Sequence, residues 1–544
     1  MKRHTAIAGL LAAAVALLAA SCGGGGSDNG NGKVGVGGAQ NITVNWGTEP
    51  PSLDPGLATD LTSANILQNI MDPLIRLDAQ LQPTPGLARS WDISKDGKTI
   101  TFHLRSDGRW TNGDPVTAQD FVFSWKRTLS PGLGADYAYQ FYGIVGAQDY
   151  NTCKSACGAK AAAMGVKALD PHTLQVKLTS RQPWFMQQVA HTSFLPVNPK
   201  AVKRWGNKWT EASHIVTDGP FKLASWRHDA RIDLVKWNGW RDASTVKLQR
   251  VNGKMLSDGT TAVSAFEADD TEVDMAGPPP ADTSRWKGKP EFQVFPALGT
   301  YYYGFNTKKI TDVNQRRAMA MAIDRGSIVT NITQASQLPA HAYVPKGMPG
   351  FSTMDVESQW LPPQGNLAGA KRLLAKVDDP VRDITLYYNN APGHKQIATA
   401  VQAMWKQLGL NVKLQQQEFK QYLQFLGPPP NADVDVYRLG WIADFPDAMN
   451  FLEQWTCKSG NNNSNFCDPR YDALVEKART TPDNSARYQL YGKLQELLFG
   501  ANGQVPFTPL YWYTFPTLIK PELKDTYKLS PLGLVDLTKV KLAS

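Results

Sequence analysis

The stretch from residue 83 to residue 127 reads PTPGLARSWDISKDGKTITFHLRSDGRWTNGDPVTAQDFVFSWKR. Within it, ITFHL at 100–104 alternates apolar and polar residues, which predicts a half-buried strand. A helix should begin after Thr117, because threonine caps helices well and Asp120, three residues later, can return a hydrogen bond to the cap. A strand followed by a capped helix indicates a fold that mixes both types of element.

The rest of the chain repeats this mixture. NITVNW at 41–46 has the alternation of a strand, and so has NVKLQQQEF at 411–419. Between them, HKQIATAVQAMWKQLG at 394–409 places its apolar residues on one helical face and ends at glycine. ARYQLYGKLQELLFG at 486–500 predicts a further amphipathic helix. These patterns predict an α/β protein with mixed sheets.

The first 40 residues are expected to be a leader and a tether. MKRH precedes an apolar run of 15 residues, which is too short for a membrane-spanning helix of about 20 residues and is typical of a secretory signal. LLAASC resembles a lipobox, so we expect residues 1–21 to be removed and Cys22 to be lipidated; ordinary secretion with a spare thiol is the alternative. Nine glycines among residues 22–38 predict a flexible tether over 22–40.

Four further cysteines favour disulfide bonds. An even number in an exported chain is typical of disulfides, and the local spacings favour the pairs Cys153–Cys157 and Cys457–Cys467. A metal site is the weaker interpretation, because no Cys-x-x-Cys occurs and no histidine lies close in sequence to either pair. We therefore expect neither a metal nor a cofactor.

Composition and missing motifs favour a binding protein over an enzyme. The net charge is +9, but no run of five or more lysines and arginines occurs, so nucleic-acid binding has little support. We find no G-x-S-x-G nucleophile elbow, no phosphate-binding loop and no H-E-x-x-H zinc motif in the sequence. The 16 tryptophans and 18 tyrosines suit ligand-contacting surfaces as well as cores.

Several long motifs, in order along nearly the whole exported chain, resemble one family. They are EPPSLDP, the 83–127 stretch, TDGPFKLASW, TYYYGFNT, RRAMAMAID and GWIADFPDAMNFL. They resemble the extracellular solute-binding proteins of the peptide/nickel class (family 5), which feed ABC importers, and most of all oligopeptide-binding lipoproteins of the OppA type.

The resemblance implies a periplasmic-binding-protein-like fold of type II, class C. Two lobes would be built from three domains with mixed sheets, and the ligand would be buried in the cleft at the hinge. Domain I would comprise residues 41–71, 197–298 and 514–544, domain II residues 72–196, and domain III residues 299–513.

The resemblance also assigns roles in RLGWIAD, residues 438–444. Asp444 would pair with the α-ammonium of a peptide, and Arg438 with the carboxylate of a short peptide. A zwitterion buried between lobes needs a partner for each charge, and arginine can hold a carboxylate with two N–H bonds. The alternative is that Arg438 and Asp444 pair with each other or with neighbouring strands.

Other matched positions are aromatic or apolar. The family lines its cavity at positions that correspond to Tyr137, Tyr302, Trp441, Tyr513 and Phe419, and His394 matches a position that can meet the carboxylate of a longer peptide. Leu426 and Thr333 depart from the pattern, because the best-known members carry cationic groups there.

The resemblance thus implies a receptor anchored to the outer face of the cytoplasmic membrane by Cys22. It would capture oligopeptides and deliver them to a permease of two membrane subunits with two ATPases, as a monomer and without covalent chemistry. The alternatives are the same transport role with a nickel chelate, haem, sugar or opine, and a receptor for a peptide signal. An exported hydrolase and a surface adhesin are more distant alternatives.

Overall fold

A large mixed sheet and a smaller antiparallel one form the framework of the protein. The computed structural model describes residues 40–354, 360–390, 393–427 and 434–543, without the side chains of residues 353–354 and 419–420. Cys22 and the predicted leader and tether over 1–39 lie outside the described residues.

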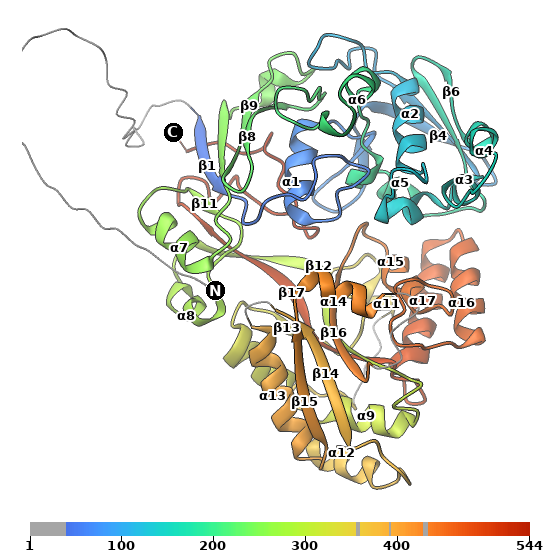
Figure 1. Cartoon of the computed structure of the whole chain (residues 1–544), viewed down its shortest axis with the longest axis vertical. Coiled ribbons are helices and arrows are strands. Elements are labelled where there is room, and N and C mark those ends of the chain that lie inside the picture. The colour runs from blue at the N-terminus through green and yellow to red at the C-terminus, as the bar shows by residue number, and fades with distance from the viewer. Residues whose placement is uncertain (1–39, 355–359, 391–392, 428–433, 544) are drawn as a thin grey trace, which may run out of the picture. The chain divides into compact units, whose positions relative to one another are not determined.

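The large sheet has eleven strands among the described residues (Figure 1). In pairing order, ten of them are β15 (Asn411–Gln417), β14 (Asp383–Asn389), β16 (Val436–Ile442), β12 (Phe292–Phe305), β17 (Phe507–Ile519), β11 (Val273–Asp274), β1 (Asn41–Asn45), β10 (Arg250–Lys254), β9 (Arg231–Lys236) and β8 (Phe221–Arg227). The eleventh, β13 (Leu338–Pro339), pairs with β17. Parallel pairs such as β14–β15 occur beside antiparallel pairs such as β12–β16, which confirms the predicted mixed sheet.

Two long strands connect the two ends of this sheet. β12 has 14 residues and β17 has 13, and they pair with each other over most of their lengths (Figure 1). Their register shifts between Pro296 and Thr300. Phe295 belongs to one hydrophobic core and Leu298 to the next, so β12 passes between cores at this irregularity. A register shift bends a strand locally, as is expected where the strand passes from one packed body to the next.

The smaller sheet contains the strand predicted from ITFHL. It orders β4 (Ala88–Ile93), β5 (Thr99–Leu104), β7 (Thr173–Lys177) and β6 (Val166–Asp170), and a separate hairpin pairs β2 (Ile75–Leu77) with β3 (Pro83–Pro85). β5 buries alternate residues, as predicted. Helix α2 (Ala118–Thr128) follows, and Thr117 and Asp120 form the predicted capping box, with the backbone N–H of Thr117 donating to Asp120 Oδ2 over 2.8 Å.

Helices cover both ends of the large sheet and the face of the small one. Those of seven or more residues, besides α2, are α1 (Leu61–Ile70), α4 (Cys157–Ala163), α6 (Pro199–Trp205), α7 (Gly259–Glu267), α8 (Pro280–Trp286), α9 (Val313–Met321), α12 (Leu367–Leu374), α13 (His394–Lys406), α14 (Phe419–Leu426), α16 (Pro469–Thr480) and α17 (Asn484–Phe499). Shorter ones are α3 (Ala147–Asn151), α5 (Phe185–Gln188), α10 (Arg325–Ser327), α11 (Phe351–Met354) and α15 (Met449–Leu452), and η1 (Asp136–Phe141) is the longest 3₁₀ segment described. α13 and α17 coincide with the two predicted amphipathic helices.

Three large hydrophobic cores lie within the compact unit Gln40–Ala543. One gathers residues from 42–71, 195–295 and 519–540, a second from 74–194, and a third mainly from 298–511. The helices and mixed sheets confirm the predicted α/β class. The exact domain boundaries stay a prediction, although the cores draw on similar segments.

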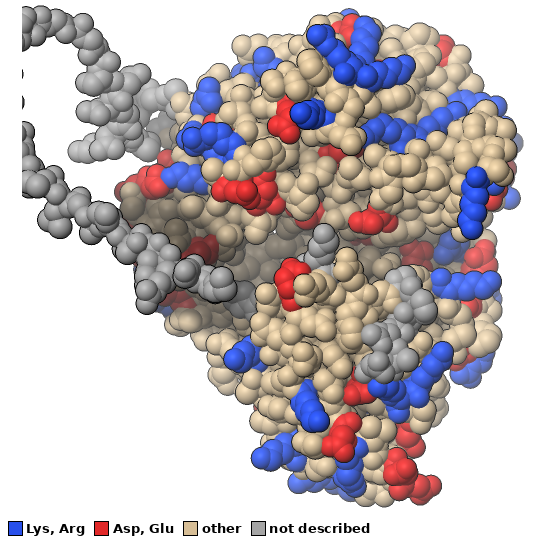
Figure 2. Space-filling view, viewed as in Figure 1, with Lys and Arg blue, Asp and Glu red and all other residues tan. Residues whose placement is uncertain are grey.

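Both predicted disulfides are present. Cys153 bonds Cys157 and Cys457 bonds Cys467, which confirms both pairings. The loop closed by the second disulfide contacts the end of β12, because the backbone N–H of Thr307 donates to the carbonyl of Ser464 over 2.9 Å. Basic and acidic side chains are interspersed over the face shown in Figure 2, without an expanse of one sign.

Candidate functional site

Arg438 lies on the central strand β16 as a buried cation. Its side chain is 9% exposed, Nη1 donates to Asn389 Oδ1 over 3.1 Å and Nη2 to Tyr513 Oη over 2.8 Å. The guanidinium carbon lies 4.4 Å from the ring centroid of Tyr301. Arg438 Nε is buried without a hydrogen-bond partner, and no carboxylate among the described residues forms an ion pair with this arginine. A buried charge without a counter-ion is costly, so this position favours an anionic ligand group.

His394 stands beside this cation, at the first residue of α13. Tyr301 Oη and His394 Nδ1 lie 3.4 Å apart, and the two rings are in contact with centroids 5.5 Å apart. Burial and the charge of Arg438 lower the pKa of His394 to about 3. His394 is therefore neutral at physiological pH and can offer a hydrogen bond rather than a charge.

Asp444 follows β16 as a half-buried anion. Its Oδ2 accepts from Asn450 Nδ2 over 3.0 Å and from Tyr139 Oη over 3.5 Å. The backbone N–H of Asp444 donates to Asn450 Oδ1 over 3.1 Å. Burial raises the pKa of Asp444 to about 6, and hydrogen bonds from Asn450 and two tyrosines limit the rise. No lysine or arginine in the described chain pairs with Asp444, so this position favours a cationic ligand group.

A second carboxyl group influences the Asp444 end of the site. Burial raises the pKa of Glu453 to about 7; Arg479 opposes the rise, and the negative charge of Asp444 adds to it. Arg479 Nη2 and Glu453 Oε2 lie 3.1 Å apart. Glu453 thus already has a cationic partner, whereas Asp444 has none among the residues that the structure describes.

The remaining predicted residues separate into two groups. Tyr513 bonds Arg438, and Trp441 Nε1 donates to Asn450 Oδ1 over 2.9 Å, which ties it to Asp444. Tyr137 is half-buried and lies beside Asp444. Burial raises the pKa of this tyrosine, and the negative charge of Asp444 and a hydrogen bond with it raise that pKa further. The structure thus brings Arg438, His394 and Tyr513 together, and Asp444, Trp441 and Tyr137 together.

Tyr302 is not part of either group. In the antiparallel register of β12 and β16, Tyr303 lies opposite Arg438, whereas Tyr302 lies opposite Leu439. Successive side chains of a strand point to opposite faces, so Tyr302 turns away from the guanidinium. It is 1% exposed and packs edge-on against Tyr343, Trp455 and other rings of the core. The structure gives its neighbour Tyr301 the contact with Arg438.

Three other positions noted in the sequence add no positive charge to the site. Phe419 opens α14, but its side chain lies outside the described residues. Leu426 is a core residue at 2% exposure, and the hydroxyl of Thr333 donates to Gln337 Oε1 over 2.9 Å. Neither supplies a positive charge, in keeping with the departure from the family pattern noted in the sequence.

Sequence reasoning missed Tyr139, Tyr301, Asn389 and Asn450. The alternation of the Thr300–Phe305 strand could have identified Tyr301, because it shares a face with Tyr303 and not with Tyr302. Asn389 lies on β14 next to β16, and Tyr139 comes from a segment some 300 residues from Asp444 in sequence. No local pattern marks such contacts.

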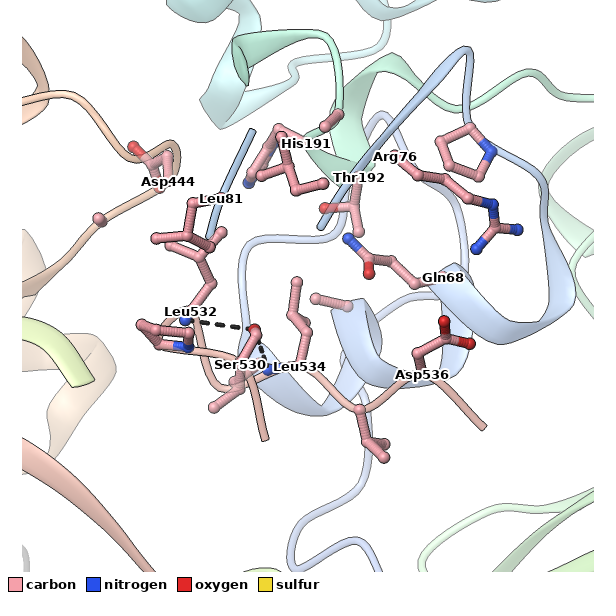
Figure 3. A pocket seen from close by; sticks show the side chains of 18 of the residues that line it. Gln68, Arg76, Leu81, His191, Thr192, Asp444, Ser530, Leu532, Leu534 and Asp536 are labelled. Carbon is pink, nitrogen blue, oxygen red and sulfur yellow. Dashed lines mark hydrogen bonds between the residues drawn. The ribbon is translucent and has the colours of Figure 1, made fainter. Parts of the chain in front are cut away.

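A cavity of about 810 Å³ adjoins Asp444 (Figure 3). Ile442, Ala443 and Asp444 line it, together with Tyr137, and its other walls come from α1, the β2–β3 hairpin, residues 187–192 and residues 528–539. Arg438, His394 and Tyr513 do not line it. The described residues contain no group of three or more histidine, cysteine or acidic side chains placed to hold a metal ion.

Comparisons with known proteins agree with this architecture. Residues 82–463 match the bacterial extracellular solute-binding proteins, family 5. The oligopeptide-binding protein OppA of Bacillus subtilis is 36% identical over 532 residues, which cover 94% of this chain and 95% of that protein. A probable deoxycholate-binding periplasmic protein of Escherichia coli is 31% identical over 487 residues, covering 87% of this chain and 88% of that protein.

Solved structures give the same result. The crystal structure of Haemophilus influenzae OppA in complex with RPPGFSPFR superposes with a TM-score of 0.78 at 28% identity, covering 93% of this chain and 99% of that one. The two-lobed type II binding-protein fold expected from the sequence is thereby confirmed.

Proposed function

The chain belongs to the bacterial extracellular solute-binding proteins of family 5, and we propose that it captures oligopeptides outside the cell and delivers them to an ABC import permease. The observation that carries the choice of ligand is a pair of opposite charges on one chain segment, each without a counter-ion in the part of the chain that the structure describes. Arg438 and Asp444 are six residues apart, and neither pairs with the other or with any charged group among the described residues.

The spacing of the two charges suits a short peptide. Arg438 and Ile442 are four steps apart on β16, or about 13 Å at about 3.3 Å per residue, and Asp444 follows two residues later. An extended peptide of about four residues spans a similar length. Its carboxylate would meet Arg438, with Tyr513 and neutral His394 beside it, and its ammonium would meet Asp444, with Tyr137 and Tyr139 alongside.

Binding would remove the electrostatic cost of both sites together. In the unliganded protein, burial disfavours the Asp444 carboxylate, as its raised pKa shows. A ligand ammonium supplies the missing partner and a charge-assisted hydrogen bond. Tyr137 and Tyr139 lie in η1, whose apolar residues Ala138 and Phe141 belong to the core of residues 74–194, whereas Asp444 follows a strand of the core of residues 298–511. A bound amine would therefore hold these two bodies together.

The permease would recognise the closed state, in which the bound ligand holds the two bodies together. A ligand shifts an open–closed equilibrium by its difference in affinity for the two states. The irregularity between Pro296 and Thr300, where β12 leaves one core for the next, is our candidate for the hinge. In this proposal the protein acts by binding alone and carries out no covalent chemistry.

The route to the cell surface is also a proposal. We propose that Cys22 is lipidated and that the glycine-rich segment over 22–40 tethers the monomeric receptor to the outer face of the cytoplasmic membrane. The lipobox-like LLAASC supports this, with nine glycines following it. None of the helices in the described part of the chain is long and apolar enough to cross a membrane.

A non-peptide ligand that carries an amine is the second candidate. It is favoured by the size of the cavity at Asp444, about 810 Å³. Such a ligand would use Asp444 but would have no need of Arg438. The role in transport would stay the same.

The deciding experiment is native mass spectrometry of protein lacking residues 1–22 and purified without denaturation. Released ligands are sequenced, and Asp444→Asn protein is processed in parallel. Peptides of mixed sequence on the wild type, and fewer on the variant, would support the proposal. A single peptide would indicate a signal receptor. A chelate, haem, glycan or steroid would refute the peptide assignment.

A further inference from the structure

Two residues of the 74–194 body, the part of the chain whose core lies within residues 74–194, are buried in a different core. Leu81 and Trp184 are 5% and 4% exposed, and both belong to the hydrophobic core of residues 298–511. Phe185, the next residue after Trp184, belongs to the core of residues 74–194. Leu81 and Trp184 therefore cross the boundary between two bodies, in a contact that the chain makes by itself.

Trp184 covers a buried arginine of α17. The guanidinium carbon of Arg487 lies 6.0 Å from the centroid of the Trp184 ring, and Arg487 is 3% exposed. Its Nη2 donates to Asp447 Oδ2 over 3.0 Å, and its Nη1 is buried without a hydrogen-bond partner in the described chain. A cation over a tryptophan ring is attracted to it, most strongly where water is excluded. Separation of the two bodies would return both the ring and the guanidinium to water.

Leu81 has a backbone conformation that leucine rarely adopts. It lies in the turn between β2 and β3 with a φ of 61°, and its backbone N–H donates to the carbonyl of Asp78 over 2.9 Å. The other residues of the 78–82 turn are exposed. A residue other than glycine at positive φ is strained and persists only where its surroundings fix it. Packing of the Leu81 side chain against the other core offsets this strain.

We propose, on the basis of the closure in the proposed function, that Leu81 and Trp184 form a latch that stabilises the closed state independently of the ligand. Trp184 does not line the cavity at Asp444, so it acts on a ligand only through closure and is a positioning residue. A receptor whose own contacts populate the closed state requires less difference in affinity from each ligand. The latch would thus raise the affinity for all ligands alike.

The latch and the ammonium anchor act on one segment of the chain. Asp447, the ionic partner of Arg487, lies three residues after Asp444. The backbone N–H of Asn450 donates to the carbonyl of Asp447 over 3.0 Å, and its side chain donates to Asp444 Oδ2 over 3.0 Å. Closure therefore brings Trp184 and the ligand amine onto the same short segment, and each contact favours the other.

Small-angle X-ray scattering of ligand-free protein tests the latch. Wild type, Trp184→Ala, Leu81→Asn and Trp205→Ala, all lacking residues 1–22, are freed of ligand in urea and refolded. Trp205→Ala is the matched control, because Trp205 is 37% exposed on α6 and stacks on His214. Leu81→Asn removes the apolar side chain and keeps the backbone, since asparagine accepts positive φ. Calorimetry of trialanine and trilysine then compares the wild type with both tryptophan variants.

We expect Trp184→Ala and Leu81→Asn to increase the radius of gyration of the ligand-free protein, because an open molecule is less compact. Trp205→Ala should leave the radius unchanged. Trp184→Ala should weaken trialanine and trilysine by the same factor, about tenfold or more, since each ligand then draws on a smaller closed population. A tryptophan that only supported its own body would change stability but neither of these quantities.

Two results overturn the inference. Equal radii for the ligand-free wild type and both latch variants would show that these contacts do not influence closure. Loss of affinity for one peptide and not the other would make Trp184 a ligand contact. If Trp184→Ala does not fold, the radius of Leu81→Asn decides by itself, and a wild-type value overturns the latch. Failure of the wild type to bind either peptide would instead refute the proposed function, while the radii would still test the latch.

Discussion

Replacing Asp444 by asparagine should stabilise the empty protein while weakening ligand binding. Asparagine is close in shape to aspartate and can still accept a hydrogen bond from Asn450, so the substitution removes mainly the charge. The substitution should have opposite effects on stability and affinity, because a buried charge that only the ligand pairs destabilises the empty protein and stabilises the complex.

The stability gain can be estimated from the pKa. Burial raises the pKa of Asp444 to about 6, from about 4 in an unfolded chain, and each tenfold change in acid strength corresponds to about 1.4 kcal/mol. Ionised Asp444 therefore costs the folded protein at most about 3 kcal/mol at neutral pH. Because the folded pKa is the higher one, this cost is absent below about pH 4 and complete above about pH 6.

The assay combines unfolding in urea at pH 7.5 and pH 5.0 with calorimetry of a short peptide. Asp444→Asn should raise the free energy of unfolding by about 1–3 kcal/mol at pH 7.5 and by less at pH 5.0. Its peptide affinity should fall by about 10- to 100-fold, the value of a hydrogen bond to a charged group. Asp149→Asn, on an exposed side chain, is the control for both measurements.

Two results would refute the reasoning. Unchanged peptide affinity in Asp444→Asn would mean that the carboxylate does not hold the ligand amine. A loss of stability at pH 7.5 would mean that the protein itself already compensates the charge, so that Asp444 is a structural residue.

Three further predictions concern Arg438, Tyr302 and Cys22. Arg438→Met should weaken a peptide with a free carboxylate by about 10- to 100-fold, while calorimetry of the amidated peptide should find equal binding to both proteins; a similar loss for both peptides would exclude Arg438 as the carboxylate partner. Tyr302→Ala should lower the free energy of unfolding by about 3–5 kcal/mol in urea titrations, because it removes a fully buried ring, whereas Tyr302→Phe should cost less than about 1.5 kcal/mol; near-native stability of Tyr302→Ala would argue for a role outside the core. Cys22→Ser should move the protein from the membrane fraction to the medium or periplasm on immunoblots, and retention on membranes would show another anchor.

Local order in this protein follows from the sequence by itself. Alternation in ITFHL predicted β5, and the Thr117–Asp120 pair predicted the start of α2, because both signals act between residues close in the chain. The spacing of the cysteines predicted both disulfides for the same reason. Long motifs in a fixed order predicted the family and with it the fold.

Only the tertiary structure decided which residues meet at the site. The register of β12 against β16 places Tyr301 beside Arg438 and sends Tyr302 into the core, a choice that depends on strand pairing across more than 130 residues. The hydrogen bond from Tyr139 to Asp444 joins segments 305 residues apart. The cavity beyond Asp444 is formed by segments from across the chain, including α1 and residues 528–539. Such contacts result from long-range packing, which a local pattern cannot specify, whereas strands, caps and nearby cysteines depend on neighbours that the sequence places side by side.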